Sequence, residues 1–428
     1  MREIKLRYSM APRVLGVLLA GFCLHLSGCQ EQPTPTPSSS LSPVAVQTEH
    51  TPLAQASPSP AGEVASRSDD GLVFRSITER YEQPVDEQGD GFRVVLPLLE
   101  GDLPEGFGED LSDISLETPE QQKAFDDRLL PVLKKSFASP TFVPSQRLLA
   151  GDSGVNYRGL RQLVTLLGMR AEQLWADGDK KGAIELASLP LSLARAMRSR
   201  PETASVNLFS SSYAESSLSL IQEWSEESSQ DPEMVESLSR VLRENTPSYQ
   251  HLQETVVVDF AQLTNSLQSD DGRKLLGIGQ VEDATLATWT EQLADIFEEA
   301  EELYGHEPTD AEDFNEKVMS AAVPIQGLVI DYPEVSTMQK HSFVKYKATE
   351  LGVALLGSDG QELRALPSEE LIGQFFDGDE ASSEVLKSLI RVEADESSIR
   401  VLGQAGQFEM LAPGVEPVFF EFQSDSPE

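Results

Sequence analysis

The fold is decided by residues 160–196, which read LRQLVTLLGMRAEQLWADGDKKGAIELASLPLSLARA. Apolar residues in its first half recur three and four positions apart, which is the spacing of one buried helix stripe. These residues are Leu160, Leu163, Val164, Leu167, Ala171, Leu174 and Trp175. Asp177-Gly178-Asp179 is a turn signal, and a second apolar run follows it at once. Two long helices joined by so short a turn run antiparallel, so the sequence predicts a helical hairpin.

The second helix of this hairpin is predicted to be buried on two sides. Its apolar residues fall on two faces, Ile184, Ala187, Leu191 and Ala194 on one and Leu186, Leu189, Leu193 and Met197 on the other. We expect small side chains to set the distance between the two helices, with Leu167, Ala171, Ala183 and Ala187 at the contact. Gly178 can supply the positive φ that a tight turn requires.

The turn of this hairpin resembles part of a known repeat. Gly178-Asp179, followed by Ala183-Ile184, resembles the turn and second-helix start of a tetratricopeptide repeat. Pro190 departs from that pattern, because the repeat prefers a small helix former there. No second Gly-Asp-x-x-x-Ala copy follows about 34 residues later. The resemblance implies one tetratricopeptide-like hairpin and not an array.

Helical signals extend on both sides of the hairpin. Thr118-Pro119-Glu120-Gln121 forms a capping box, and Pro131 is expected to kink or break the helix that it opens. Further helix starts are predicted at Pro201, Asp231-Pro232, Thr246-Pro247 and Thr309, with long helices over 284–304 and 334–356 and a stop at Gly357. Residues 72–81 could form a short helix, whereas 92–99 have strand composition interrupted by Pro97.

The C-terminal part changes its hydrophobic period. A short helix is expected to start near Leu366, and alternation then predicts short strands. These strands are predicted at 390–393, 399–402, 408–411 and 418–422. The predicted fold class is mainly α, a multi-helix body built on antiparallel hairpins with a small C-terminal antiparallel β (α+β) subdomain.

The first residues form a targeting segment. Four basic residues precede an apolar stretch at 14–26, which is too short to span a bilayer. Leu26-Ser27-Gly28-Cys29 resembles the lipobox of bacterial lipoproteins. That resemblance implies cleavage before Cys29, a diacylglycerol on its sulfur and an acyl chain such as palmitate on its amino group. The alternative is an ordinary secretory signal with an incidental cysteine. Gln30, in place of the usual retention aspartate, favours the outer membrane.

Four segments are therefore predicted. Residues 1–28 are the signal peptide, and 29–68 are the lipidated Cys29 with a Pro-, Ser- and Thr-rich tether that cannot bury enough apolar surface to fold. Residues 69–357 form the helical body, and 358–428 form the α+β subdomain. The order of elements over about residues 70–420 resembles a group of bacterial envelope proteins, from which no activity carries over.

Charge and composition exclude several functions. The chain has a formal net charge of −38 at pH 7, which argues against nucleic acid and against direct contact with anionic lipid headgroups. Cys23 leaves with the signal and Cys29 is alkylated, so no disulfide and no Cys-ligated metal is predicted. His251, His306 and His341 have no second histidine at metal-ligand spacing. We predict no catalytic residue, no metal site and no cofactor.

Two function classes remain open. The first is a non-enzymatic interaction or scaffold lipoprotein, facing the periplasm or the cell surface, held to the membrane by its lipid and contacting a protein partner in the envelope. The second is an envelope hydrolase that uses dispersed carboxylates in a cleft. Two facing, desolvated carboxylates between the helical body and the sheet would favour the hydrolase.

Overall fold

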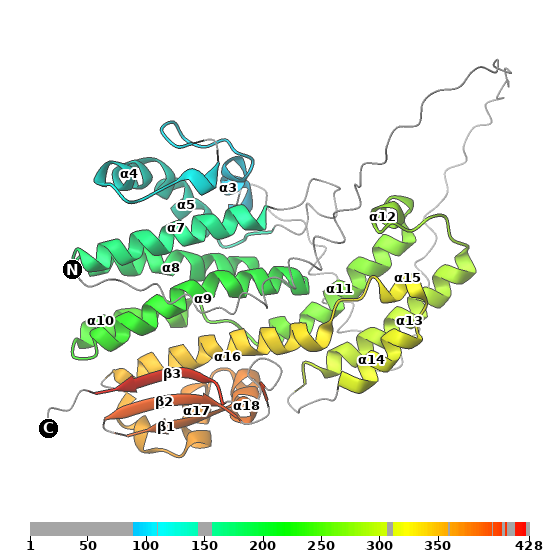
Figure 1. Ribbon diagram of the computed structural model, residues 1–428. Helices are drawn as coiled ribbons and strands as arrows, with labels where there is room; N and C mark the ends of the chain where they lie inside the picture. The colour runs from blue at the N-terminus through cyan, green and yellow to red at the C-terminus, as the bar shows by residue number, and fades with distance from the viewer. Residues whose placement is uncertain are drawn as a thin grey trace. The chain divides into compact units, whose positions relative to one another are not determined.

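The computed structural model describes residues 89–108, 110–143, 156–305, 311–357, 360–395, 397–404, 407–408 and 416–424. The described residues all belong to one compact unit, Ala65–Glu428. This unit is mainly helical with a small antiparallel sheet near the C-terminus, which confirms the predicted fold class (Figure 1). Among the helices described, none is long and apolar enough to cross a membrane. Cys29 and the predicted helix at 72–81 lie outside the described residues.

The predicted hairpin is confirmed. It consists of α7 (Tyr157–Ala176) and α8 (Lys180–Met197), which pack on each other. Gly178 between them has a φ of 88°, a conformation that favours glycine. The Asp179 side chain caps α8 by accepting a hydrogen bond from the Gly182 N–H. The expected contact residues are buried, with Leu167, Ala171 and Ala183 at 0 % exposure and Ala187 at 2 %. Helix α8 runs through Pro190 without ending.

Two further long helices extend this packing. Helix α9 (Ala204–Glu227) lies against α8, and α16 (Tyr332–Leu356) lies against α9 and α10 (Pro232–Glu244). Figure 1 shows α7, α8, α9 and α16 as successive layers, with the sheet beyond α16. The predicted start of α9 at Pro201 is wrong, because the Thr203 side chain caps the helix and it begins at Ala204. The predicted stop of α16 at Gly357 is confirmed.

The predicted strand at 92–99 is wrong, because these residues form helix α3 (Gly91–Leu99). The Asp90 side chain caps this helix, and its buried residues Phe92, Val95 and Leu98 recur at helical spacing. Pro97 lacks the N–H that would bond the Arg93 carbonyl. Both residues lie on the exposed face, so water can bond that carbonyl instead.

The helix opened by the Thr118 capping box widens at its middle and continues. It comprises α4 (Pro119–Ala124), the π-helical turn η2 (Phe125–Leu129) and α5 (Leu130–Phe137), and both hydrogen bonds of the capping box are present. Pro131 was expected to kink or break this helix. The π-helical turn before Pro131 is wider than an α-helical turn, and the Leu130 N–H donates to the Phe125 carbonyl within it. This wider turn relieves the clash that a proline makes with the preceding turn of a helix.

A second group of helices follows α10. It consists of α11 (Gln250–Gln268), α12 (Asp270–Leu275), α13 (Asp283–Glu302), α14 (Ala311–Ser320) and α15 (Val323–Gln326). Helix α13 packs on α11 and confirms the helix predicted at 284–304. The predicted helix start at Thr246-Pro247 is wrong. Helix α11 begins at Gln250, and the Thr246 hydroxyl donates to Glu350 of α16 instead. Thr309 lies outside the described residues.

The C-terminal part contains two short helices and a sheet. These elements are α17 (Ser368–Phe375), α18 (Glu380–Leu389), β1 (Ile390–Ala394), β2 (Ser398–Gly403) and β3 (Val418–Gln423). The strands are antiparallel in the order β1-β2-β3, with Val401 opposite Val392 and Phe420. Helix α18 was not predicted. Phe408, predicted to start a strand, lies in a turn, and the rest of 408–411 lies outside the described residues.

The sheet packs directly on α16 at a glycine. A Cβ on Gly352 would lie 2.3 Å from ring atoms of Phe420 on β3, so only glycine allows this approach. One continuous hydrophobic core includes buried residues of α7, α16 and β3. The hydrophobic core of the described residues is therefore continuous across residue 357. The domain boundary predicted there stays a prediction.

Candidate functional site

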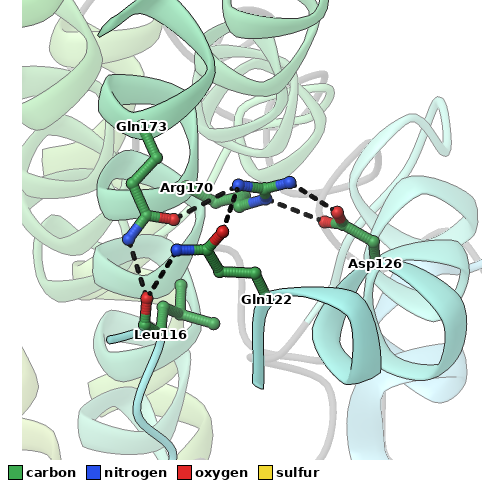
Figure 2. A network of polar contacts seen from close by, with 5 residues as sticks. All are labelled: Leu116, Gln122, Asp126, Arg170 and Gln173. Carbon is green, nitrogen blue, oxygen red and sulfur yellow. Dashed lines mark hydrogen bonds and ion pairs between the residues drawn. The ribbon is translucent and has the colours of Figure 1, made fainter. Parts of the chain in front are cut away.

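Two arginines are buried to the same degree in this core, and the contrast between them locates the site. Arg170 on α7 and Arg198 at the end of α8 are each 8 % exposed. The Arg170 guanidinium donates to both carboxylate oxygens of Asp126, at 3.0 and 2.7 Å (Figure 2). Its Nη1 donates to the side-chain oxygens of Gln122 and Gln173, both at 3.3 Å. Arg170 is thus fully compensated and ties the π-helical turn to α7.

Arg198 has no such compensation. Its Nε donates to the Ser210 hydroxyl at 2.7 Å and its Nη2 to the Ser211 hydroxyl at 3.0 Å. Among the described residues, no carboxylate lies within ion-pair distance of this guanidinium. Burial lowers the pKa of Arg198 to about 10, an effect that nearby Tyr346 opposes, so the side chain stays charged at neutral pH. The partial negative charge at the end of α8 stabilises it only in part.

Arg198 lines a pocket between α9 and α16. The connection from α10 to α11 closes one side through Pro247, and α11 contributes Leu252. Among the described residues that line it, Glu215 is the one carboxylate, and its Oε1 pairs with Lys345 Nζ at 2.6 Å. Counting the described residues alone, the pocket therefore holds one balanced ion pair and one cation without a counter-ion.

Two hydroxyl groups add hydrogen-bond donors to this cation. Ser211 accepts from Arg198, and its own hydroxyl hydrogen has no acceptor in the described part of the chain. Ser342 on α16 also lines the pocket, and its hydroxyl has no described partner. A hydroxyl hydrogen rotates to suit its acceptor, so both groups can point at a bound anion. The arrangement of one guanidinium and two hydroxyl donors is chemically an anion site.

The wall of the pocket is held rigidly by Gln339. Its Oε1 accepts from the Tyr304 hydroxyl at 2.7 Å, and its Nε2 donates to the Ala204 carbonyl at 3.2 Å. The empty space measures about 370 Å³ when the part open to solvent is included. The enclosed part has room for roughly one water molecule. Only a small group can therefore reach Arg198 without movement of the helices.

A buried carboxylate lies next to this wall. Asp259 on α11 accepts from the Tyr332 hydroxyl at 2.6 Å and from the Ala204 N–H, the first residue of α9. Burial raises the pKa of Asp259 to about 7, although the hydrogen bonds from Tyr332 and Ala204 act in the opposite direction. Asp259 thus joins the starts of α9 and α16, and Ala204 bonds to Asp259 through its N–H and to Gln339 through its carbonyl.

The arrangement nearest to the predicted hydrolase site lies elsewhere, between α16 and α18. Lys347 Nζ lies 3.9 Å from Glu350 and 3.4 Å from Asp379. Burial raises the pKa of Glu350, while Lys347 and the Thr246 hydroxyl bond lower it. Lys347 lies within ion-pair distance of both carboxylates, and Asp379 also caps α18 by accepting from the Ser382 N–H. Neither carboxylate lines the Arg198 pocket.

The residues considered from the sequence do not assemble into a site. Cys29 and His306 lie outside the described residues. His251 lies on α11, whereas His341 on α16 contacts the rings of Phe408 and Phe419, and its burial lowers its pKa. In the part of the chain described here, no group of three or more His, Cys, Asp or Glu residues could hold a metal ion.

The Arg198 site was missed because α16, which contributes Ser342, lies more than a hundred residues after Arg198 and Ser211 in the chain. One signal was available, since consecutive serines interrupt the apolar face of α9. Ser210 is fully buried and Ser211 is 8 % exposed. Buried hydroxyls need partners, so inward serines indicate a polar group packed against them.

Comparison with known proteins gives no relative. No protein-family model, no curated protein and no solved structure matches this chain.

Proposed function

We propose that this protein is a lipid-anchored cell-envelope protein whose helical body is a non-enzymatic binding module. The module receives an anionic group of its partner or ligand in the pocket at Arg198. One observation carries the proposal, namely a charged guanidinium that is 8 % exposed, lines a pocket and has no carboxylate partner among the described residues.

The energetics favour an anion at this place. A buried charge without a counter-ion destabilises a folded protein by several kcal/mol, whereas a hydrogen bond to a charged group contributes about 1.5–3 kcal/mol. An incoming anion would accept from Arg198, Ser211 and Ser342 together. The contrast with Arg170 supports this interpretation, because the same fold places a bidentate carboxylate where an arginine is only structural.

The envelope location rests on the N-terminal sequence. Leu26-Ser27-Gly28-Cys29 supports lipidation at Cys29, and Gln30 favours the outer membrane. Several acyl chains provide strong anchoring, since each buried methylene contributes about 0.8 kcal/mol. The partners of this proposal are thus the membrane, through the lipid, and an envelope protein or ligand that carries an anionic group.

Acetate tests the binding function directly. The thermal unfolding midpoint of the full chain is measured with increasing concentrations of acetate. The ionic strength is held constant with the salt of a sulfonate anion that is too bulky for the pocket. A ligand that binds only the folded state raises the midpoint with concentration, so we expect acetate to stabilise the wild type.

Two arginine variants make the test specific. We expect Arg198→Gln to lose the response to acetate, and Arg243→Gln, which removes an exposed arginine outside the pocket, to keep it. An equal response of Arg198→Gln and wild type, or no response of the wild type, would contradict the proposal.

A further inference from the structure

The other residues that line the pocket restrict the chemical class of the ligand that it can bind. Outside the polar groups it is apolar, with Ala214 and Leu218 on α9, Leu252 on α11 and Phe343 on α16. These side chains line the same pocket as Arg198. An occupant therefore meets apolar surface around its charged end, and burial of its own apolar atoms would add to binding.

The size of the enclosed space selects a small, flat anionic group. The enclosed part of the pocket, which Arg198 helps to line, has room for roughly one water molecule. A planar carboxylate matches the fork of an arginine and can insert edge-on, whereas a tetrahedral phosphate needs space on all sides. The head of the ligand would enter and its body would remain at the mouth.

Charge disfavours a second negative group on the ligand. The chain has a net charge of −38, so a polyanion pays a larger electrostatic penalty on approach than a monoanion does. Glu215 also lies in the lining, where Lys345 already neutralises it. A second carboxylate on the ligand would face Glu215 with no free cation among the described lining residues.

From these three observations, and resting on the proposed binding function, we infer that the Arg198 pocket recognises a single carboxylate carried on a small apolar group. Two sources share this chemistry, a free branched-chain monocarboxylic acid and the C-terminal carboxylate of a polypeptide that ends in an apolar residue. In both, the carboxylate accepts from Arg198, Ser211 and Ser342, and the apolar part covers Leu218 and Leu252.

Calorimetric titration of the full chain compares five probes, namely acetate, isovalerate, N-acetyl-leucine, N-acetyl-leucine amide and inorganic phosphate. The inference predicts that at least one of isovalerate and N-acetyl-leucine binds about tenfold or more tightly than acetate, since two or three additional methyl or methylene groups become buried. It also predicts that the amide binds about tenfold or more weakly than N-acetyl-leucine, because the amide lacks the charge.

The same probes separate the two sources. Tight binding of isovalerate indicates a free acid, whereas tight binding of N-acetyl-leucine with isovalerate at the acetate level indicates a polypeptide terminus. Phosphate or acetate binding as tightly as both apolar carboxylates would overturn the inference and leave the proposed anion-binding function standing. If none of the five probes binds, both fail.

Variants localise the binding without depending on one substitution. We expect Arg198→Gln to abolish binding and Arg243→Gln, the exposed control, to leave it unchanged. If Arg198→Gln does not fold, Ser342→Ala serves, because Ser342 is partly exposed and its hydroxyl has no described partner. We expect that variant to weaken N-acetyl-leucine or isovalerate binding several-fold, and unchanged binding in both Ser342→Ala and Arg198→Lys would overturn the inference.

Discussion

At the residue scale, two equally buried arginines have different roles. Arg170 and Arg198 are each 8 % exposed, yet only Arg170 has a carboxylate partner among the described residues. The π-helical turn before Pro131 contributes to this difference, because it contains the Asp126 that faces Arg170 (Figure 2). A paired buried charge is structural, and a buried charge without a described counter-ion that lines a pocket is a candidate binding group.

The structural role of Arg170 predicts the effect of removing its partner charge. Asp126→Asn should lower the free energy of unfolding by about 1–3 kcal/mol, because a buried guanidinium loses its charged bidentate acceptor. Asp127→Asn, at the neighbouring exposed position, should change it by less than about 0.5 kcal/mol. Urea unfolding of the two variants checks this expectation, and equal midpoints would show that the Asp126 pair contributes nothing.

At the element scale, turns and small residues set the helix packing. Gly178 provides a positive φ between α7 and α8, and Gly352 allows Phe420 to reach the α16 backbone. Ala183 on α8 is 0 % exposed, and the sequence predicts it at the contact with α7. A Cβ at residue 352 would clash with the Phe420 ring, and residue 178 has a backbone conformation that favours glycine.

The hairpin contact gives a prediction with an internal control. Ala183→Leu should lower the free energy of unfolding by about 1–3 kcal/mol, because added methylenes overpack the contact. Lys181→Leu introduces the same side chain two positions earlier on the exposed side of α8, and it should have little effect. Urea melts that place Ala183→Leu level with Lys181→Leu would mean that the hairpin is not packed as described.

The junction of α9, α11 and α16 predicts a pH dependence. An unfolded aspartate has a pKa of about 3.9, and burial raises that of Asp259 to about 7. Between these values the folded state holds a proton that the unfolded chain has released. The stability that Asp259 contributes is therefore fully present below about pH 4 and is lost as the pH rises through about 7.

Asp259→Asn isolates this contribution. Asparagine keeps an acceptor for the Tyr332 hydroxyl and the Ala204 N–H but does not titrate there. The free energy of unfolding of the wild type minus that of Asp259→Asn should fall between pH 5 and pH 8, at no more than about 1.4 kcal/mol per pH unit. Urea melts at both pH values measure it, and a difference that rises with pH would contradict the burial of this carboxylate.

The sequence predicted the helices well where apolar spacing and caps agree, as at Thr118, Asp231 and residues 284–304. It misled at 92–99, where the composition, interrupted by Pro97, suggested a strand although the buried residues follow helical spacing. The Arg198 site could not be predicted, because packing of α9 against α16 brings Ser211 and Ser342 together. No local motif encodes that contact, and one buried serine pair was the available signal.

At the scale of the whole molecule, the account combines a predicted anchor, a tether and a helical body with one binding pocket. The anchor rests on Cys29 and the pocket on Arg198, and the two are independent of each other. The net charge of −38 at pH 7 repels polyanions.

The anchor has its own test. The intact mass of the protein from membranes should show a mature chain that begins at a lipid-modified Cys29. Cys29→Ala should be recovered outside the detergent phase after phase partition, since it has no site for the acyl chains. An unmodified Cys29 in the wild type would refute the lipidation.

The most direct measurement of the central claim follows the Arg198 side chain itself. In protein labelled with ¹⁵N-arginine, the Arg198 Nε–H resonance is identified by its loss in Arg198→Lys. The account predicts that this resonance shifts in a saturable way when N-acetyl-leucine or isovalerate is added, and stays in place with N-acetyl-leucine amide. An Arg198 resonance that remains fixed throughout the titrations with both carboxylates would contradict the account.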